Sequence, residues 1–83
     1  MKLLYFAWVR SKVGIAQEEV MPPESITTVA ELIDWLRNRG HGYADAFAYP
    51  DRIRVAINQD FANFDDQITG NDEIALFPPV TGG

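Results

Sequence analysis

Residues 28–40 read TVAELIDWLRNRG and predict the one long helix of this chain. Thr28 and Glu31 make the Thr-x-x-Glu pattern of a capping box, in which each side chain bonds a free backbone N–H at the helix start. Apolar residues then recur at helical spacing and form one stripe: Val29, Leu32, Ile33 and Leu36. Gly40 is placed to take the left-handed conformation that commonly follows the last turn of a helix.

The segments on either side of this helix have the composition of strands. Residues 3–9 are apolar on both faces, which is typical of a central strand, and residues 18–21 predict a short return strand. After the helix, one further helical turn is predicted before three strands, of which the middle one is short: residues 43–49, 53–58, 59–64 and 73–77. This order predicts an α+β fold of the β-grasp (ubiquitin-like) kind, with a mixed sheet of about five strands packed on one main helix.

Size and composition limit what this chain can do. Its 83 residues predict one domain, residues 1–83, of which residues 78–83 are an extended, flexible tail. So small a domain has little room for a deep active-site cavity. The sequence has no cysteine, which excludes disulfides and thiolate chemistry and favours a reducing compartment, the cytoplasm. Its net charge of −5 disfavours binding to nucleic acid or to an anionic membrane.

No internal group of residues has the pattern of a catalytic or metal site. His41, the only histidine, has no nucleophile or further metal ligands at suitable spacing, so we interpret it as a surface-loop residue. The acidic pairs Asp65-Asp66 and Asp72-Glu73 do not follow the alternating ligand pattern of a calcium loop. We interpret both pairs as solvated turn residues.

The C-terminal segment has a pattern that does indicate function. Pro78 and Pro79 release the chain from the sheet, and the apolar residues beside them have no further element to cover them. The final glycines lack Cβ atoms, so the backbone can enter a narrow channel. From Pro79 to Gly83 an extended chain reaches about 15–17 Å. We expect this segment to bind a partner and to deliver its end, Gly83, into the partner's site; the residues before Gly83 in the segment are Phe77, Pro78, Pro79, Val80, Thr81 and Gly82.

Three segments resemble the small-subunit family of molybdopterin synthase, and together they span the chain. They read LYFAWVR at residues 4–10, AINQ at residues 56–59 and DEIALFPPVTGG at residues 72–83, the last being by far the most specific. Ser11 departs from the family, in which an acidic residue is usual, and residues 70–71 replace its Asp-Gly turn. Both departures keep surface or turn chemistry.

The resemblance implies a sulfur carrier that binds no cofactor of its own. A ubiquitin-activating-like adenylyltransferase would use ATP and magnesium to adenylate Gly83, and a sulfurtransferase system would replace AMP with sulfur to leave a thiocarboxylate. The tail would then enter the large synthase subunit, which holds the catalytic pocket, and pass sulfur to cyclic pyranopterin monophosphate. Two carriers would serve the two dithiolene sulfurs in a heterotetramer.

The residues leave other functions open. A carrier for thiazole synthesis or tRNA thiolation would share the Gly-Gly end, and so would a protein modifier that is attached to lysines. A noncovalent β-grasp interaction module would dock through its sheet edge or through residues 77–80. The Phe-Pro-Pro-Val-Thr segment before the glycines favours the pterin pathway.

Overall fold

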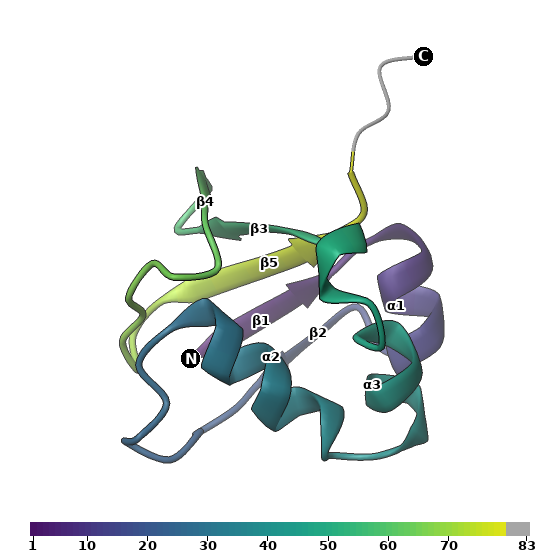
Figure 1. The fold of residues 1–83 in the computed structure, drawn as a ribbon, viewed down its shortest axis with the longest axis horizontal. Helices are drawn as coiled ribbons and strands as arrows, with labels where there is room; N and C mark the ends of the chain where they lie inside the picture. The colour runs from purple at the N-terminus through teal and green to yellow at the C-terminus, as the bar shows by residue number, and fades with distance from the viewer. Residues whose placement is uncertain (80–83) are drawn as a thin grey trace.

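The computed structural model of the protein describes residues 1–79. Five strands form one mixed sheet in the order β2-β1-β5-β3-β4, with β1 and β5 parallel and the other neighbours antiparallel (Figure 1). The strands are β1 (Lys2–Tyr5), β2 (Gln17–Glu19), β3 (Arg54–Ile57), β4 (Asp60–Ala62) and β5 (Glu73–Phe77). A parallel central pair, β1 and β5, with an antiparallel strand beside each and a helix between the two halves of the chain is the β-grasp arrangement, as the sequence predicted.

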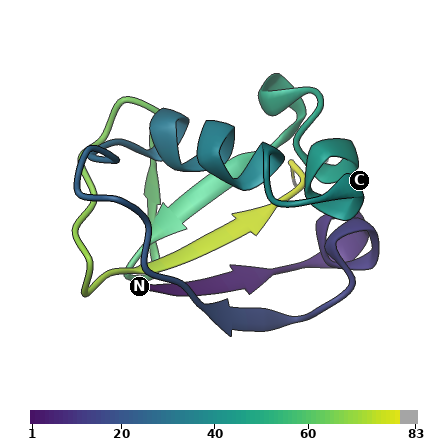
Figure 2. The ribbon, with the colours of Figure 1, turned by 90° about the horizontal axis from the view of Figure 1, so that it is seen from below.

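Helix α2 (Val29–Arg37) covers one face of this sheet (Figure 2). The capping box is present: the Glu31 amide donates to the Thr28 hydroxyl oxygen over 3.2 Å, and the Thr28 amide donates to the Glu31 carboxylate over 3.1 Å. All four residues of the predicted apolar stripe are buried, so the stripe is the core face of the helix. The helix ends at Arg37 and Asn38 caps it, so the prediction that Gly40 caps this helix was wrong; Gly40 precedes the next helix instead.

The first strand is shorter than the sequence indicated. β1 ends at Tyr5, and the chain turns at Ala7, whose φ is +53°, into helix α1 (Ala7–Val13). The prediction of a strand through residue 9 was therefore wrong, because Trp8 and Val9 belong to this helix. Val9 is fully buried in the core. An apolar side chain can occupy such a buried position from a helix as well as from a strand. Gly14 ends the helix in the left-handed conformation.

Two further short helices follow α2. Helix α3 (His41–Ala46) lies against α1 at the end of the sheet, and the 3₁₀ helix η1 (Pro50–Arg52) precedes β3 (Figure 1). His41 is exposed, as predicted, but it opens α3 rather than lying in a loop. Pro50 begins the 3₁₀ turn and does not end a helix.

The core lies between the sheet and the helices. Leu3, Tyr5, Val55, Ile74 and Leu76 alternate with outward-facing residues along their strands and are almost fully buried against the stripe of α2. None of the buried residues among those described is polar or charged. None of the helices in residues 1–79 has the length and hydrophobicity needed to cross a membrane.

Candidate functional site

The last described residues place the base of the tail at one corner of the sheet. β5 has the bounds that the sequence predicted, and its pairing with β3 ends where Phe77 lies opposite Arg54. Pro78 and Pro79 follow this pair and are partly exposed. The chain leaves the sheet beside α1 and η1 (Figure 1). Of the predicted site, residues 80–83 lie outside the described part of the chain, including Gly83.

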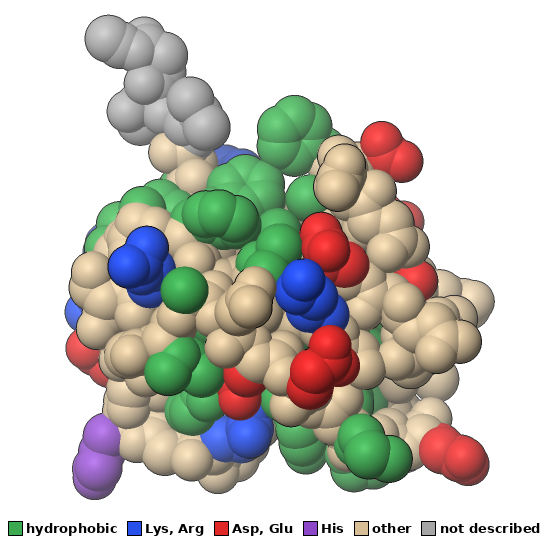
Figure 3. All heavy atoms as spheres, turned by 180° about the vertical axis from the view of Figure 1, so that it is seen from behind, with side chains coloured by type: hydrophobic (Ala, Val, Ile, Leu, Met, Phe, Trp, Pro, Cys, Tyr) green, Lys and Arg blue, Asp and Glu red, His purple; other side chains and the backbone are tan. Residues whose placement is uncertain are grey.

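The face of the sheet opposite α2 carries a hydrophobic patch that reaches this corner. Its residues alternate with the core residues along four strands, and we call them the open-face patch: Leu4, Ala56, Phe61, Ala75 and Phe77. Phe61 is 84% exposed, and its ring lies 5.9 Å from the ring of Phe77. Figure 3 shows hydrophobic side chains gathered on this face below the tail. Phe61 is exposed and Phe77 is half-buried, and exposed apolar surface of this kind commonly marks a protein-binding site.

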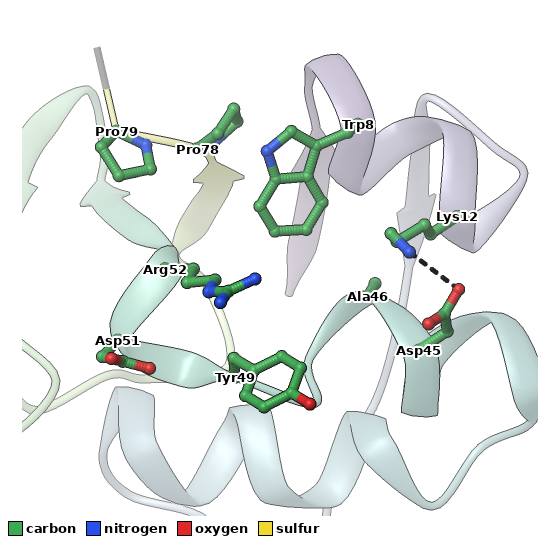
Figure 4. A pocket seen from close by; sticks show the side chains of 9 residues that line it. All are labelled: Trp8, Lys12, Asp45, Ala46, Tyr49, Asp51, Arg52, Pro78 and Pro79. Carbon is green, nitrogen blue, oxygen red and sulfur yellow. Dashed lines mark hydrogen bonds and ion pairs between the residues drawn. The ribbon is translucent and has the colours of Figure 1, made fainter. Parts of the chain in front are cut away.

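A groove of about 720 Å³ lies on the other side of the tail base, where α1, α3 and η1 meet. We call it the tail-base groove; it is lined by Trp8, Lys12, Asp45, Ala46, Tyr49, Asp51, Arg52, Pro78 and Pro79. The Trp8 indole and the Arg52 guanidinium point into it from opposite walls (Figure 4). Arg52 lies over the Tyr49 ring at 4.7 Å from its centroid, in cation–π geometry.

Two contacts hold the helical walls of this groove together. Lys12 of α1 pairs with Asp45 of α3 at 2.9 Å, shown as the dashed line in Figure 4. Gly42 of α3 packs so closely on α1 that a Cβ atom there would lie 2.4 Å from the Lys12 carbonyl oxygen. The close approach therefore depends on glycine at this position.

Comparison with known proteins assigns the chain to a family. The model of the ThiS family matches residues 3–83. The chain belongs to the ThiS family. The molybdopterin synthase sulfur carrier subunit of Escherichia coli is 38% identical to it, with 99% of this chain and 98% of the relative covered. The subunit of the same name from Homo sapiens is 31% identical, with 99% and 92% covered.

A solved structure agrees with this ThiS-family assignment. The crystal structure of SAMP1 from Haloferax volcanii superimposes with a TM-score of 0.74 at 28% identity, over 100% of this chain and 98% of that one. The resemblance that the sequence suggested is therefore confirmed over the full length, and so is the fold.

Asp66 and Asp72, two of the acidic residues interpreted from the sequence as turn residues, have hydrogen-bond partners in this ThiS-family fold. Asp66 accepts a hydrogen bond from the Asn63 amide, and Asp72 accepts from the Thr69 amide and the Asn58 side chain. These bonds from Asn58 and Thr69 outweigh the effect of burial and hold the pKa of Asp72 below its usual value. Within residues 1–79, no three His, Asp or Glu side chains are grouped to hold a metal ion.

A carboxylate at the edge of the sheet, that of Glu18, was not predicted from the sequence as part of any site. Glu18 of β2 accepts hydrogen bonds from the hydroxyls of Tyr5 and Tyr43, both at 2.7 Å to Oε2. Arg39 donates to its Oε1 at 3.1 Å, and that guanidinium also lies over the rings of Trp35 and Tyr43. Burial raises the pKa of Glu18, but the three donors outweigh it and the pKa lies below its usual value. Burial and the bond to Glu18 raise the pKa values of both tyrosines.

Phe61, Tyr49 and Arg52 were not predicted from the sequence as binding residues. Phe61 lies in the segment predicted as a short strand, and its exposure depends on the register of β4 against β3. Tyr49 precedes the 3₁₀ helix η1 and Arg52 ends it, and their proximity to Trp8 follows from the packing of η1 near α1. A Tyr-x-x-Arg spacing carries no signal of such a groove by itself.

Proposed function

We propose that this ThiS-family chain is the sulfur carrier of a molybdopterin synthase, and that its reactive group is the carboxylate of Gly83. The full-length match to relatives named molybdopterin synthase sulfur carrier subunit carries the proposal. The position of Pro78 and Pro79 supports it, because they direct the chain out of the sheet at one corner. Gly82 and Gly83 then suit entry into a narrow site of a second protein.

The proposed chemistry starts at an unreactive group. An α-carboxyl has a pKa of about 3.3–3.7, so at neutral pH the Gly83 carboxylate is an anion that resists nucleophiles. An adenylyltransferase of the ubiquitin-activating type transfers AMP from magnesium-bound ATP to this carboxylate and releases pyrophosphate. A sulfurtransferase system then supplies sulfide sulfur, which displaces AMP and leaves the Gly83 thiocarboxylate. The absence of cysteine suits a reducing compartment, so the proposal assigns this reaction to the cytoplasm.

The large synthase subunit is the proposed acceptor of the charged tail. In this proposal it supplies the acid–base groups and the pocket for cyclic pyranopterin monophosphate, and the carrier supplies sulfur and a docking surface. The open-face patch is that surface, because the exposed Phe61 ring packs beside the half-buried Phe77 ring next to the tail base. Buried aromatic side chains commonly dominate the binding energy of an interface.

The decisive experiment measures the intact mass of the protein after incubation with the adenylyltransferase, ATP, magnesium and a sulfur source. We expect a mass change of one oxygen-to-sulfur exchange, confined to the C-terminal peptide. A variant with one residue appended after Gly83 displaces the carboxylate and should stay unmodified. An unchanged mass of the wild-type chain, with an adenylyltransferase shown to be active on another carrier, would contradict the proposal.

Deletion of Gly82 and Gly83 separates chemistry from folding. We expect sulfur transfer to stop and the Tm to stay within a few degrees, because the buried core extends no further than Leu76 in the described chain. Normal binding of the appended variant to its partners, together with full biological activity, would favour the noncovalent module instead. A large fall in Tm on deletion would show that the last two residues stabilise the fold.

A further inference from the structure

We infer that the tail-base groove is a second docking site for the large subunit. The large subunit inserts an apolar side chain into the groove and places a carboxylate beside it. This inference rests on the proposed function, since it names how the acceptor of the tail grips the carrier. Pro78 and Pro79 line the groove and also continue the strand that carries Phe77 of the open-face patch. A protein that encloses the tail must therefore meet the groove on one side and the patch on the other.

The groove has the chemistry of a binding hot spot. Trp8 is half-buried and Tyr49 is 61% exposed, so both rings offer apolar surface that is already held in place. Tryptophan, tyrosine and arginine are the side chains most enriched among residues that dominate binding energy. Trp8, Tyr49 and Arg52 line the groove next to Pro79. Four residues follow Pro79, and fully extended they would span about 13–14 Å to the sulfur-bearing end.

The charged side chains of the groove indicate which kind of partner side chain binds there. Lys12 is neutralised by Asp45, at 2.9 Å. Arg52 is exposed and makes no ion pair within residues 1–79, although Asp51 also lines the groove. Its guanidinium is held over the Tyr49 ring, with its donors free to bind a carboxylate. We therefore expect an acidic residue of the partner at Arg52 and an apolar side chain between Trp8 and Tyr49.

The walls of the groove are set before any partner binds. The Lys12–Asp45 pair and the close packing of Gly42 on α1 fix α1 against α3. Preorganised walls reduce the entropy cost of binding. A partner that binds beside the tail base therefore meets a groove whose walls are already in place.

The two tryptophans make a direct test. The chain has two, Trp8 in the groove and Trp35 on α2, where it lines a separate hollow with residues of that helix. In a ¹⁵N-labelled sample titrated with the large subunit, the Trp8 indole N–H signal should shift and the Trp35 signal should not. Equal shifts of the two signals, or a shift of Trp35 alone, would overturn the inference.

The same spectrum identifies a competing occupant. A chain truncated after Pro79 and lacking any partner should give the Trp8 signal of the full-length chain. If truncation moves that signal as far as the large subunit does, the groove holds residues 80–83 of its own chain, and the inference is wrong.

Variants measure the contribution of the groove to affinity. Tyr49→Ala and Arg52→Glu should each raise the Kd for the large subunit about five- to thirtyfold, the range of substantial interface truncations. Met21→Ala and Arg37→Glu are matched controls, because Met21 is 94% exposed and Arg37 lies on α2, both outside the groove. The controls should stay within twofold. Far-UV circular dichroism and Tm verify that every variant folds.

These results separate the groove from the proposed function. Failure of the wild-type chain to bind the large subunit would count against the function itself. Binding that is weakened by Phe77→Ala but unchanged by Tyr49→Ala and Arg52→Glu would leave the function standing and remove the groove from the interface.

Discussion

Replacement of Glu18 by alanine should destabilise the protein by about 2–3 kcal/mol, far more than its place on a short edge strand indicates. The Glu18 side chain is only 14% exposed and accepts three hydrogen bonds. The Tyr5 hydroxyl has no other partner among the described bonds, and Tyr5 is 1% exposed, so its donor would be left unsatisfied at about 1–3 kcal/mol. Tyr43 and Arg39 are partly exposed and can bind water instead, so they add less.

Glu19 provides the matched control on the same strand. Its side chain is 77% exposed and approaches only the N-terminal ammonium group, at 3.7 Å, so Glu19→Ala should cost less than about 0.5 kcal/mol. Urea unfolding followed by circular dichroism gives both free energies, and equal m-values verify that the two variants unfold in the same way. For a domain of this size, 1 kcal/mol corresponds to about 4–8 °C in Tm.

The double variant Tyr5→Phe/Glu18→Ala tests the stated cause. Tyr5→Phe removes the hydroxyl donor that Glu18→Ala leaves without an acceptor. The loss of stability in the double variant should therefore be smaller than the sum of the losses in the two single variants. A loss of stability in Glu18→Ala no larger than that in Glu19→Ala, or strict additivity with Tyr5→Phe, would refute this account of the cluster.

The pH dependence of the Glu18 contribution has a definite sign. The pKa of Glu18 is lower in the folded protein than in the unfolded chain, so the folded protein stabilises the ionised carboxylate. The contribution of Glu18 to the free energy of unfolding is therefore complete at pH values above its unfolded-state pKa of about 4.3. It is lost as the pH falls through the folded-state pKa. The stability difference between wild type and Glu18→Gln should accordingly shrink below about pH 4. A difference that grows on acidification would contradict the direction of this shift.

Three further substitutions test the backbone. Gly42→Ala should destabilise by about 1–3 kcal/mol in urea unfolding, because the new Cβ meets the Lys12 carbonyl and forces α1 from α3. Gln59→Gly should stabilise by up to about 1 kcal/mol in the same measurement, because the φ of +75° in the two-residue β3–β4 turn costs an L-residue about 1–2 kcal/mol and the added chain entropy of glycine returns only about 0.5–1 kcal/mol; a loss would contradict this. Thr28→Ala should lower the Tm by removing the cap of α2, at a cost of about 1 kcal/mol, and an unchanged Tm would show that Glu31 alone suffices.

Local patterns explain which elements the sequence predicted well. The stripe and capping box of α2 depend on residues within one helix, and both occur as the spacing indicated. The bounds of β5 follow from an apolar segment that Pro78 must end. The end of β1 was missed because the apolar run continues through Trp8 and Val9, and apolar side chains suit a buried strand or a buried helix equally well.

The amino-acid sequence by itself determined the β-grasp class, the family and the position of the proposed reactive group, because each depends on order along the chain. Only the tertiary structure decided which side chains meet. The Glu18 cluster joins residues 5, 18, 39 and 43, and the tail-base groove joins α1, α3, η1 and the two prolines. Packing of the helices on the sheet creates these contacts between distant residues, and no spacing along the chain records them.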